Sequence, residues 1–257
     1  MFTKNPDWDA MPWRHWTDPT ERFMVMPSFV IGEFYFLFLA SVTLLHAISH
    51  GRTHLFVWVA SLCAGTANDA FFMVLPIVDN FWQAQACIML TPRMPLYIPC
   101  VYVVFMYTST VACWRLGLSF WSSVCLTGLM GEMIYAPYDI TGIKFLWWTW
   151  HDTDAPIRHR LLGVPIGSSV WVITFTACFQ FCVTLTIKGQ TCWARQLLGL
   201  LVTSLLSTPL MMLQMAALQA VALDSQGLPS LNSLLALLII YLAVIGRSWS
   251  SRRLEAR

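Results

Sequence analysis

The stretch from Pro27 to His50 reads PSFVIGEFYFLFLASVTLLHAISH, and Glu33 is the only carboxylate in this mostly apolar run. Crossing the hydrocarbon core of a bilayer takes about 20 mostly apolar residues in helical form. A single segment satisfies its own backbone hydrogen bonds in lipid only as a helix. The stretch therefore predicts a transmembrane helix.

Six further runs of similar length and character follow. They extend over about His54 to Pro76, Pro95 to Arg115, Leu118 to Ile140, Gly163 to Lys188, Trp193 to Leu223 and Gly227 to Arg247. The third span of the series opens on Pro95, and proline suits the first turn of a helix. The sequence predicts an all-α fold, an integral membrane bundle of about seven transmembrane helices.

Composition supports the same class. Apolar residues make up 57% of the 257-residue chain and charged residues 11%, whereas a soluble domain carries about 25% charged residues. The mean hydropathy is +0.62. A water-soluble fold is excluded on these grounds. The net charge of +2 is small and the basic residues are scattered, so we expect the lipid bilayer as partner and no nucleic acid.

We divide the chain into a polar N-terminal segment (1–26), a seven-helix membrane domain (27–246) and a basic C-terminal tail (247–257). The first segment lacks the short apolar core of a cleavable signal, so we expect the first span to act as the targeting signal. The arginines of the tail are expected to meet anionic headgroups.

Two long aromatic loops, 77–94 and 141–162, are expected on the N-terminal face, where tryptophan suits the headgroup level. Lys and Arg number 7 on that face and 8 on the other, which orients the chain only weakly. The concentration of arginine in the tail favours a cytoplasmic C-terminus. The sequence does not indicate which organelle holds the protein.

Acids inside the spans are the informative residues, because an ionisable group in a membrane span is costly and is a functional-site hypothesis by default. Glu33 lies about six residues into the first span, which starts on the N-terminal face. Asp69 and Glu132 lie about fifteen residues into spans that start on the opposite face. At about 1.5 Å per residue, all three are expected roughly 10 Å below the N-terminal face.

Other polar residues are expected at the same depth, so the polar residues form a layer in this interpretation. They are Asn68, Tyr102, Ser168, Ser169, Gln219 and Asn232. The layer indicates a half-buried cavity with an aromatic roof, which Trp82, Trp147, Trp148 and Trp150 would provide. From this set we take as candidate substrate-binding residues Asn68, Tyr102, Trp148, Trp150 and Ser168.

The candidate catalytic residues are Glu132 and Asp69 as an acid and base pair, with Glu33 in support. A carboxyl group in a low-dielectric site can stay protonated and deliver a proton to a weakly basic substrate. Such chemistry suits hydration or cyclisation of an isoprenoid or another lipid, with aromatic walls to shelter a cation. No cofactor is expected.

Two other hypotheses remain open for the same layer. Polar groups also form hydrogen-bonded packing networks between membrane helices. A non-catalytic transporter or lipid-binding scaffold would use the layer as a proton or substrate site. The discriminating feature is whether the layer opens sideways to the bilayer or to water on both faces, and whether the protein is an enzyme stays open at this point.

Histidines occur in two places that could suggest a metal. The string His151-Asp152-Thr153-Asp154, with His159, matches no strong metal motif, so a solvated loop is favoured. His46, His50 and His54 recur every four residues at the other face, where interfacial solvation is favoured. The cysteines show no metal or disulfide spacing, and no metal site is predicted.

The segment from Glu132 to Trp171, with PYDITGIKFLWWTWHDTD at residues 137–154, resembles an uncharacterised family of animal multi-pass membrane proteins. The resemblance extends from Pro27 to about Phe181. It implies the membrane fold and no particular activity.

A more distant resemblance is to the membrane carotenoid hydratases of the bacterioruberin pathway. It rests on an acidic helix, Trp148-Thr-Trp150, Gly163-Val-Pro165 and the following Trp171. The resemblance implies acid-catalysed addition of water to an isoprenoid double bond, with roles for Asp69, Glu132 and Asp139. This chain has Ser168-Ser169 where that family is expected to have an Asn.

Overall fold

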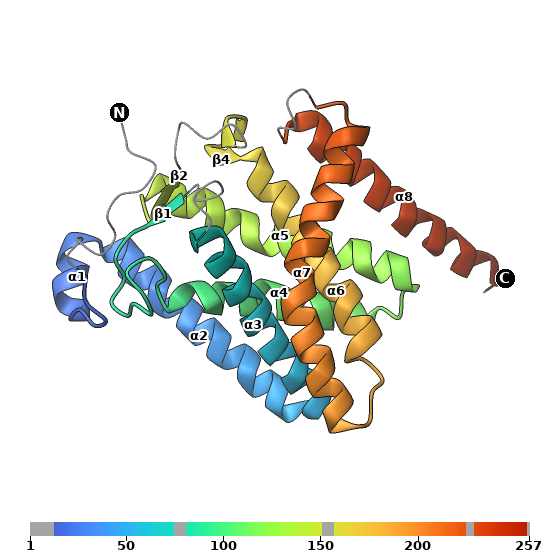
Figure 1. The fold of residues 1–257 in the computed structure, drawn as a ribbon, viewed down its shortest axis with the longest axis horizontal. Coiled ribbons are helices and arrows are strands. Elements are labelled where there is room, and N and C mark those ends of the chain that lie inside the picture. Colours follow the sequence, from blue (N-terminus) through green and yellow to red (C-terminus); the bar gives the residue numbers. More distant parts are fainter. Residues whose placement is uncertain (1–12, 75–80, 151–156, 225–228, 256–257) are drawn as a thin grey trace.

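The computed structural model describes residues 13–74, 81–150, 157–224 and 229–255. In these ranges the chain forms eight helices, α1 to α8 (Figure 1). Their bounds are α1 Pro19–Val25, α2 Pro27–Ser49, α3 Arg52–Val74, α4 Tyr97–Arg115, α5 Phe120–Lys144, α6 Ile166–Thr186, α7 Trp193–Val221 and α8 Leu231–Glu255.

Six of these helices are long and apolar enough to cross a membrane, namely α2, α3, α4, α6, α7 and α8. The chain is therefore an integral, multi-pass membrane protein. The sequence predicts about seven spans. Seven of the described helices are long enough to span a membrane, but α5 is not apolar enough to be counted with the other six. The 25-residue helix α5 is as long as the others, but Glu132, Asp139 and Lys144 lower its hydropathy.

The helices pack as a bundle in which α5, α6 and α7 follow one another side by side, and α3 lies against both α4 and α7. Small residues bring α5 and α6 together: a Cβ atom on Gly131 would lie 2.7 Å from the Thr176 hydroxyl oxygen of α6. Such close approach through small residues is the usual way in which membrane helices associate. The last helix, α8, packs on α5, α6 and α7 and exposes most of its surface.

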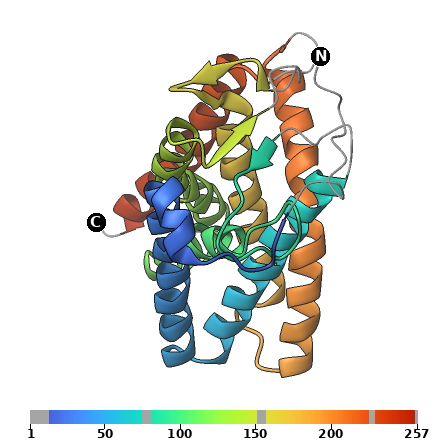
Figure 2. The same ribbon diagram turned by 90° about the vertical axis from the view of Figure 1, so that its left-hand side faces the viewer.

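Four short strands lie at one end of the bundle, the end at which α2 begins (Figure 2). They are β1 Phe81–Gln83, β2 Trp148–Trp150, β3 Arg160–Leu161 and β4 Val164–Pro165. The antiparallel pair β1–β2 joins the loop after α3 to the loop after α5, with Trp82 opposite Thr149. The antiparallel pair β3–β4 forms a tight hairpin that leads into α6.

The two ends of the chain differ from the expectation. The polar N-terminal segment contains a short helix, α1, which begins at an N-cap where Asp18 accepts a hydrogen bond from the Thr20 N–H group. At the other end, α8 continues through the basic tail to Glu255. Arginine is a good helix former, which is consistent with this continuation.

Candidate functional site

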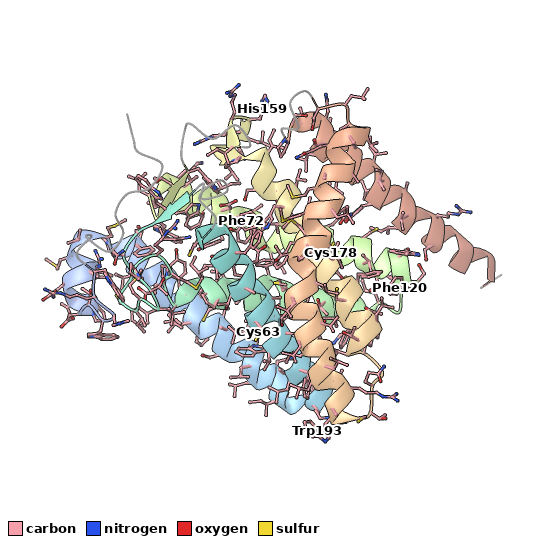
Figure 3. All side chains as sticks on the ribbon, in the orientation of Figure 1. Cys63, Phe72, Phe120, His159, Cys178 and Trp193 are labelled. Carbon is pink, nitrogen blue, oxygen red and sulfur yellow. The ribbon has the colours of Figure 1, made fainter. Side chains whose placement is uncertain are left out.

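A cavity of about 300 Å³ opens among α3, α4, α5, α6 and α7, beneath the strands β1 and β2. Its wall is mostly aromatic and aliphatic, with a few polar side chains. Phe72, one of the lining residues, lies toward the strand end of α3, far from Trp193 at the opposite edge of the molecule (Figure 3). Concave, mostly apolar spaces of this size with a few polar groups are typical of small-molecule sites.

Asp69 of α3 is the first carboxyl group on the cavity wall, and it is 4% exposed. The Tyr102 hydroxyl of α4 donates a hydrogen bond to Asp69 Oδ1. The Asn68 side-chain amide donates to the same Tyr102 oxygen over 3.4 Å, and the Thr208 hydroxyl of α7 donates to Asn68 Oδ1 over 3.0 Å. Three helices thus hold Asp69 in one position.

A second carboxyl group, Asp139 of α5, reaches the cavity through Ser168 of α6. The Ser168 hydroxyl donates to Asp139 Oδ2 over 2.7 Å, and Ser168 itself lines the cavity. Asp139 is 2% exposed, and its other oxygen, Oδ1, is buried without a hydrogen-bond partner among the described residues.

Tyr135 connects these acids. It lines the cavity, and it lies within electrostatic range of Asp139, Asp69 and Glu132. Glu132, one turn before Tyr135 on α5, is half-buried beside Ser169 and does not line the cavity. Its Oε2 atom is buried and has no partner in the described part of the chain.

The indole rings at the end of α5 form the roof of the cavity. Trp148 and Trp150 line it, whereas Trp147 packs beside Phe29 and donates a hydrogen bond to the Ser28 hydroxyl over 3.3 Å. The rings of Trp147 and Trp148 each pack against a glycine. A Cβ atom on Gly32 would collide with the Trp147 ring, and one on Gly142 with the Trp148 ring.

Glu33 lies outside the cavity wall, although it is 1% exposed. Its two oxygens accept hydrogen bonds from backbone N–H groups of the loop before α4: Oε2 from Cys87 over 2.8 Å and Oε1 from Ile88 over 3.0 Å. Each carboxylate oxygen of Glu33 thus accepts one backbone hydrogen bond from this loop and helps to anchor it.

Two further polar atoms around the cavity are buried and have no partner among the described residues: Tyr138 Oη and Trp171 Nε1. Tyr138 is 8% exposed. Buried polar groups are nearly always hydrogen-bonded, and each exception calls for a ligand, a water molecule or a functional reason. These unpaired polar atoms of the cavity wall are consistent with a ligand that is mostly apolar and carries one or two polar atoms.

Among the residues that the sequence singled out, the structure brings six together at the cavity: Asn68, Asp69, Tyr102, Trp148, Trp150 and Ser168. Gln219 also lines it, whereas Asn232 is exposed at the start of α8. His151, Asp152, Thr153 and Asp154 lie outside the described residues.

Sequence reasoning did not include Tyr135 or Tyr138 in the site and named Asp139 only through the resemblance to carotenoid hydratases, although a signal for all three was present. These residues follow Glu132 at steps of three, six and seven, so all four share one face of α5. It also missed a group of methionines on α7 that completes the wall: Met211, Met212 and Met215.

The described residues contain no cluster of three or more His, Cys, Asp or Glu side chains that could hold a metal ion.

The model of one protein family matches residues 7–255, and that family is described as a domain of unknown function, DUF7802. No curated protein and no solved structure matches the chain.

Proposed function

Because the chain belongs to the DUF7802 family, whose description assigns no activity, we propose its function from its own cavity. The proposal is an intramembrane enzyme that performs acid–base chemistry with carboxyl groups, of the hydration or cyclisation type, on an isoprenoid or another apolar lipid.

One observation carries the proposal: Asp69 lines an aromatic cavity, Asp139 of another helix reaches it through the Ser168 hydroxyl, and Tyr135 lies within range of both acids. An alkene or epoxide has no strongly basic atom, so its activation requires a proton from a group held away from water. The wall formed by Tyr135, Trp148 and Trp171 offers aromatic faces to a cation.

In the proposed hydration, Asp69 starts in its protonated form, with Oδ1 held by Tyr102. Its proton passes to the less substituted carbon of the double bond, and the π bond breaks to leave a carbocation. A water molecule then forms a C–O bond with that carbon. Ser168 accepts the proton that the water loses while its own hydroxyl proton moves to Asp139. The net change is alkene plus water to alcohol, with no redox step.

Regeneration requires the proton to return from Asp139 to Asp69. Tyr135 lies within range of both carboxyl groups and its hydroxyl can exchange a proton in this direction. Glu132 is proposed as the reserve acid behind Tyr135, and Glu33 as a positioning residue that holds the loop before α4.

We also infer that α5 crosses the membrane, which gives seven spans. Its 25 residues are long enough, and its polar side chains face α6 and the cavity rather than the lipid: Ser168 and Ser169 of α6 lie at Asp139 and Glu132. Ionisable residues inside membrane proteins are found on such interior faces.

The alternative function is non-catalytic binding or transport of a lipid. The observation that favours it is the completeness of the network around Asp69, in which Tyr102, Asn68 and Thr208 hold one another in place. A carboxyl group in such a network can serve packing or ligand recognition without changing its protonation state.

The test compares lipid extracts by mass spectrometry from cells that produce the wild type, Asp69→Asn, Asp139→Asn or no protein. The amide variants keep the shape and hydrogen-bonding capacity of the side chains and lose the acidic proton. We expect one lipid class to gain a water molecule, or to change its isomer pattern, with the wild type only. The matched control is Glu21→Gln, an exposed acid on α1, which should behave as the wild type.

Wild-type lipid conversion in both amide variants, at normal abundance, would contradict the catalytic proposal. An unchanged lipid profile in the wild type, together with stoichiometric co-purification of a lipid that Asp69→Asn fails to retain, would establish the binding function instead.

A further inference from the structure

The end of the bundle opposite the cavity carries a compact group of cationic and imidazole side chains. It consists of His46 and His50 near the end of α2, His54 near the start of α3 and Arg115 at the end of α4. Trp193, on the neighbouring start of α7, marks this end at the lower edge of Figure 3. We name these four residues the His–Arg cluster.

The cluster has a defined geometry. The rings of His46 and His50 stack with their centroids 3.9 Å apart, and the ring of His54 lies 5.2 Å from that of His50. One nitrogen of Arg115, Nη2, donates to His46 Nε2 over 3.2 Å and to His50 Nε2 over 3.5 Å. The guanidinium is therefore held against the edges of two stacked imidazoles.

The hydrogen bonds assign the imidazole tautomers. An arginine can only donate, so the Nε2 atoms that it reaches act as acceptors. His50 Nδ1 lies 2.9 Å from the His46 carbonyl oxygen, and His46 Nδ1 lies 2.8 Å from the Tyr107 hydroxyl. Both imidazoles are thus neutral with the proton on Nδ1, and the charge of the cluster is that of Arg115.

That charge has no carboxylate partner. The Nε and Nη1 groups of Arg115 meet no acceptor among the described residues, and the side chain is exposed. The segments 50–54, 115–119 and 187–195, which form this end of α2, α3, α4, α6 and α7, contain four Lys or Arg residues and no Asp or Glu. Positive charge accumulates here without internal compensation.

Lys188 extends the positive surface. Lys188 places its ammonium group 5.2 Å from the ring centre of Trp114, and the ring of Trp114 lies 5.8 Å from that of His54. On α2, Leu45 and Ile48 flank the histidines and are 67% and 57% exposed. A polar, cationic cluster bordered by exposed aliphatic side chains at the end of a membrane helix matches the level of lipid headgroups.

We propose that the His–Arg cluster binds a phosphate group, and that its natural source is the headgroup of an anionic phospholipid. Arg115 would donate charge-assisted hydrogen bonds to phosphate oxygens from its remaining N–H groups, on Nε and Nη1. The ring of His54, 5.2 Å from that of His50, borders the same cluster, and the exposed Leu45 and Ile48 would lie along the acyl chains. This site is independent of the cavity and of the proposed enzymatic activity.

The experiment uses the purified full-length protein in a neutral detergent and measures binding of short-chain phosphatidic acid by native mass spectrometry. Phosphatidylcholine of the same chain length is the reference lipid, because its headgroup carries no net charge. A second arm follows the thermal unfolding midpoint with inorganic phosphate alone. Binding is measured for the wild type, Arg115→Gln, Arg115→Lys and the control Arg195→Gln.

We expect phosphatidic acid to bind in preference to phosphatidylcholine. Arg115→Gln should weaken that binding about tenfold, since a charge-assisted pair of hydrogen bonds is lost. Arg115→Lys keeps the charge without the planar fork and should give an intermediate affinity. Arg195→Gln removes one charge from the same face outside the cluster and should bind as the wild type.

If inorganic phosphate stabilises the wild type as strongly as phosphatidic acid does, and Arg115→Gln abolishes this effect, the result would support the phosphate site and identify a soluble phosphate as its source. An equal loss in Arg195→Gln, or full binding by Arg115→Gln, would overturn the proposal in favour of diffuse surface charge. Size-exclusion profiles identical to that of the wild type identify the variants that have kept their fold, and Arg115→Lys gives the answer if Arg115→Gln does not.

Discussion

At the scale of single residues, Glu33 and Asp69 show how one sequence signal serves two different purposes. Both are carboxylates inside apolar spans, and both are almost fully buried. Glu33 has both oxygens occupied by backbone N–H groups of one loop, whereas Asp69 receives a hydroxyl donor at Oδ1 and faces the cavity. The helical rise predicts one depth for both acids but not their partners, which come from a loop for Glu33 and from α4 for Asp69.

Replacing Glu33 by Gln should destabilise the protein while leaving the cavity chemistry intact. Glutamine has one acceptor oxygen, so one of the N–H groups of Cys87 and Ile88 would face an amide donor in a buried place. Leaving such a group unsatisfied costs about 1–3 kcal/mol. The thermal unfolding midpoint in detergent measures the loss, with Glu21→Gln as the exposed control. Equal midpoints for both variants would contradict the anchoring role.

At the scale of elements, the end of α5 decides where the roof of the cavity lies. The helix ends with Leu146 in the left-handed region, at φ 56°, while the Trp147 N–H group donates to the Gly142 carbonyl over 2.8 Å and the Leu146 N–H group to the Ile143 carbonyl over 3.3 Å. This is the usual hydrogen-bond pattern of a helix end that normally places glycine at the left-handed position.

The sequence predicts most of the helices closely and misses this helix end for a physical reason. Apolar length alone places α2, α3, α4, α6 and α7 within a few residues, because hydrocarbon thickness fixes their length, whereas α8 continues past the expected end at Arg247 to Glu255. For α5 it indicates an end near Ile140, since Leu146 is not a glycine and gives no signal of a left-handed cap. The last turn, which carries Gly142 beneath Trp148, was therefore assigned to a loop, and the contact between them could not be foreseen.

Replacing Gly142 by Ala should displace Trp148 from the roof. A Cβ atom on Gly142 would overlap the six-membered ring of that indole, and overpacking of this kind costs about 1–3 kcal/mol. The unfolding midpoint should fall, and binding of any cavity ligand should weaken. Gly246→Ala is the control, because a Cβ atom there meets no heavy atom within 4 Å.

A double variant makes the test specific to this contact. Combining Gly142→Ala with Trp148→Leu frees space for the new methyl group, so the two effects should be non-additive, as is expected for residues in contact. Strict additivity of the two midpoint changes would show that Gly142 acts through something other than Trp148.

At the scale of the whole molecule, the two ends of the bundle differ in chemistry. One end carries the strands, the cavity and most of the acidic residues, and the other carries the His–Arg cluster and an arginine-rich helix end. The number of spans between the ends determines which loops share a side of the membrane, and α5 is the element on which that number depends.

Labelling with a membrane-impermeant maleimide should place Thr20→Cys and the native Cys192 on opposite sides of the membrane. Five helices, α2 to α6, lie between these positions, so the chain crosses an odd number of times if α5 spans and an even number if it does not. Sealed vesicles of known orientation, before and after permeabilisation, give the measurement. Labelling of both sites from one side would show that α5 does not cross.

The native cysteines suit this test. Cys192 is exposed, and the backbone N–H groups of Arg195 and Ala194 lower the pKa of its thiol, which increases the reactive thiolate at neutral pH. Burial, with the neighbouring Glu33 carboxylate, raises the pKa of the Cys87 thiol to about 12, so that thiol stays protonated. Cys192→Ser provides the background signal from the remaining cysteines.

The pairing of β1 with β2 has a consequence for biogenesis. The ribosome completes β1 about 65 residues before it completes β2, a delay of roughly 3–13 s at about 5–20 residues per second. Once Tyr102 has been added during that interval, Asp69 and Tyr102 are both in the nascent chain while the strand that will cover them is still unmade. The newly inserted protein therefore passes through a stage without a roof, and a bulky lipid that enters then can become enclosed when translation delivers Trp148 and Trp150 and then α6 and α7.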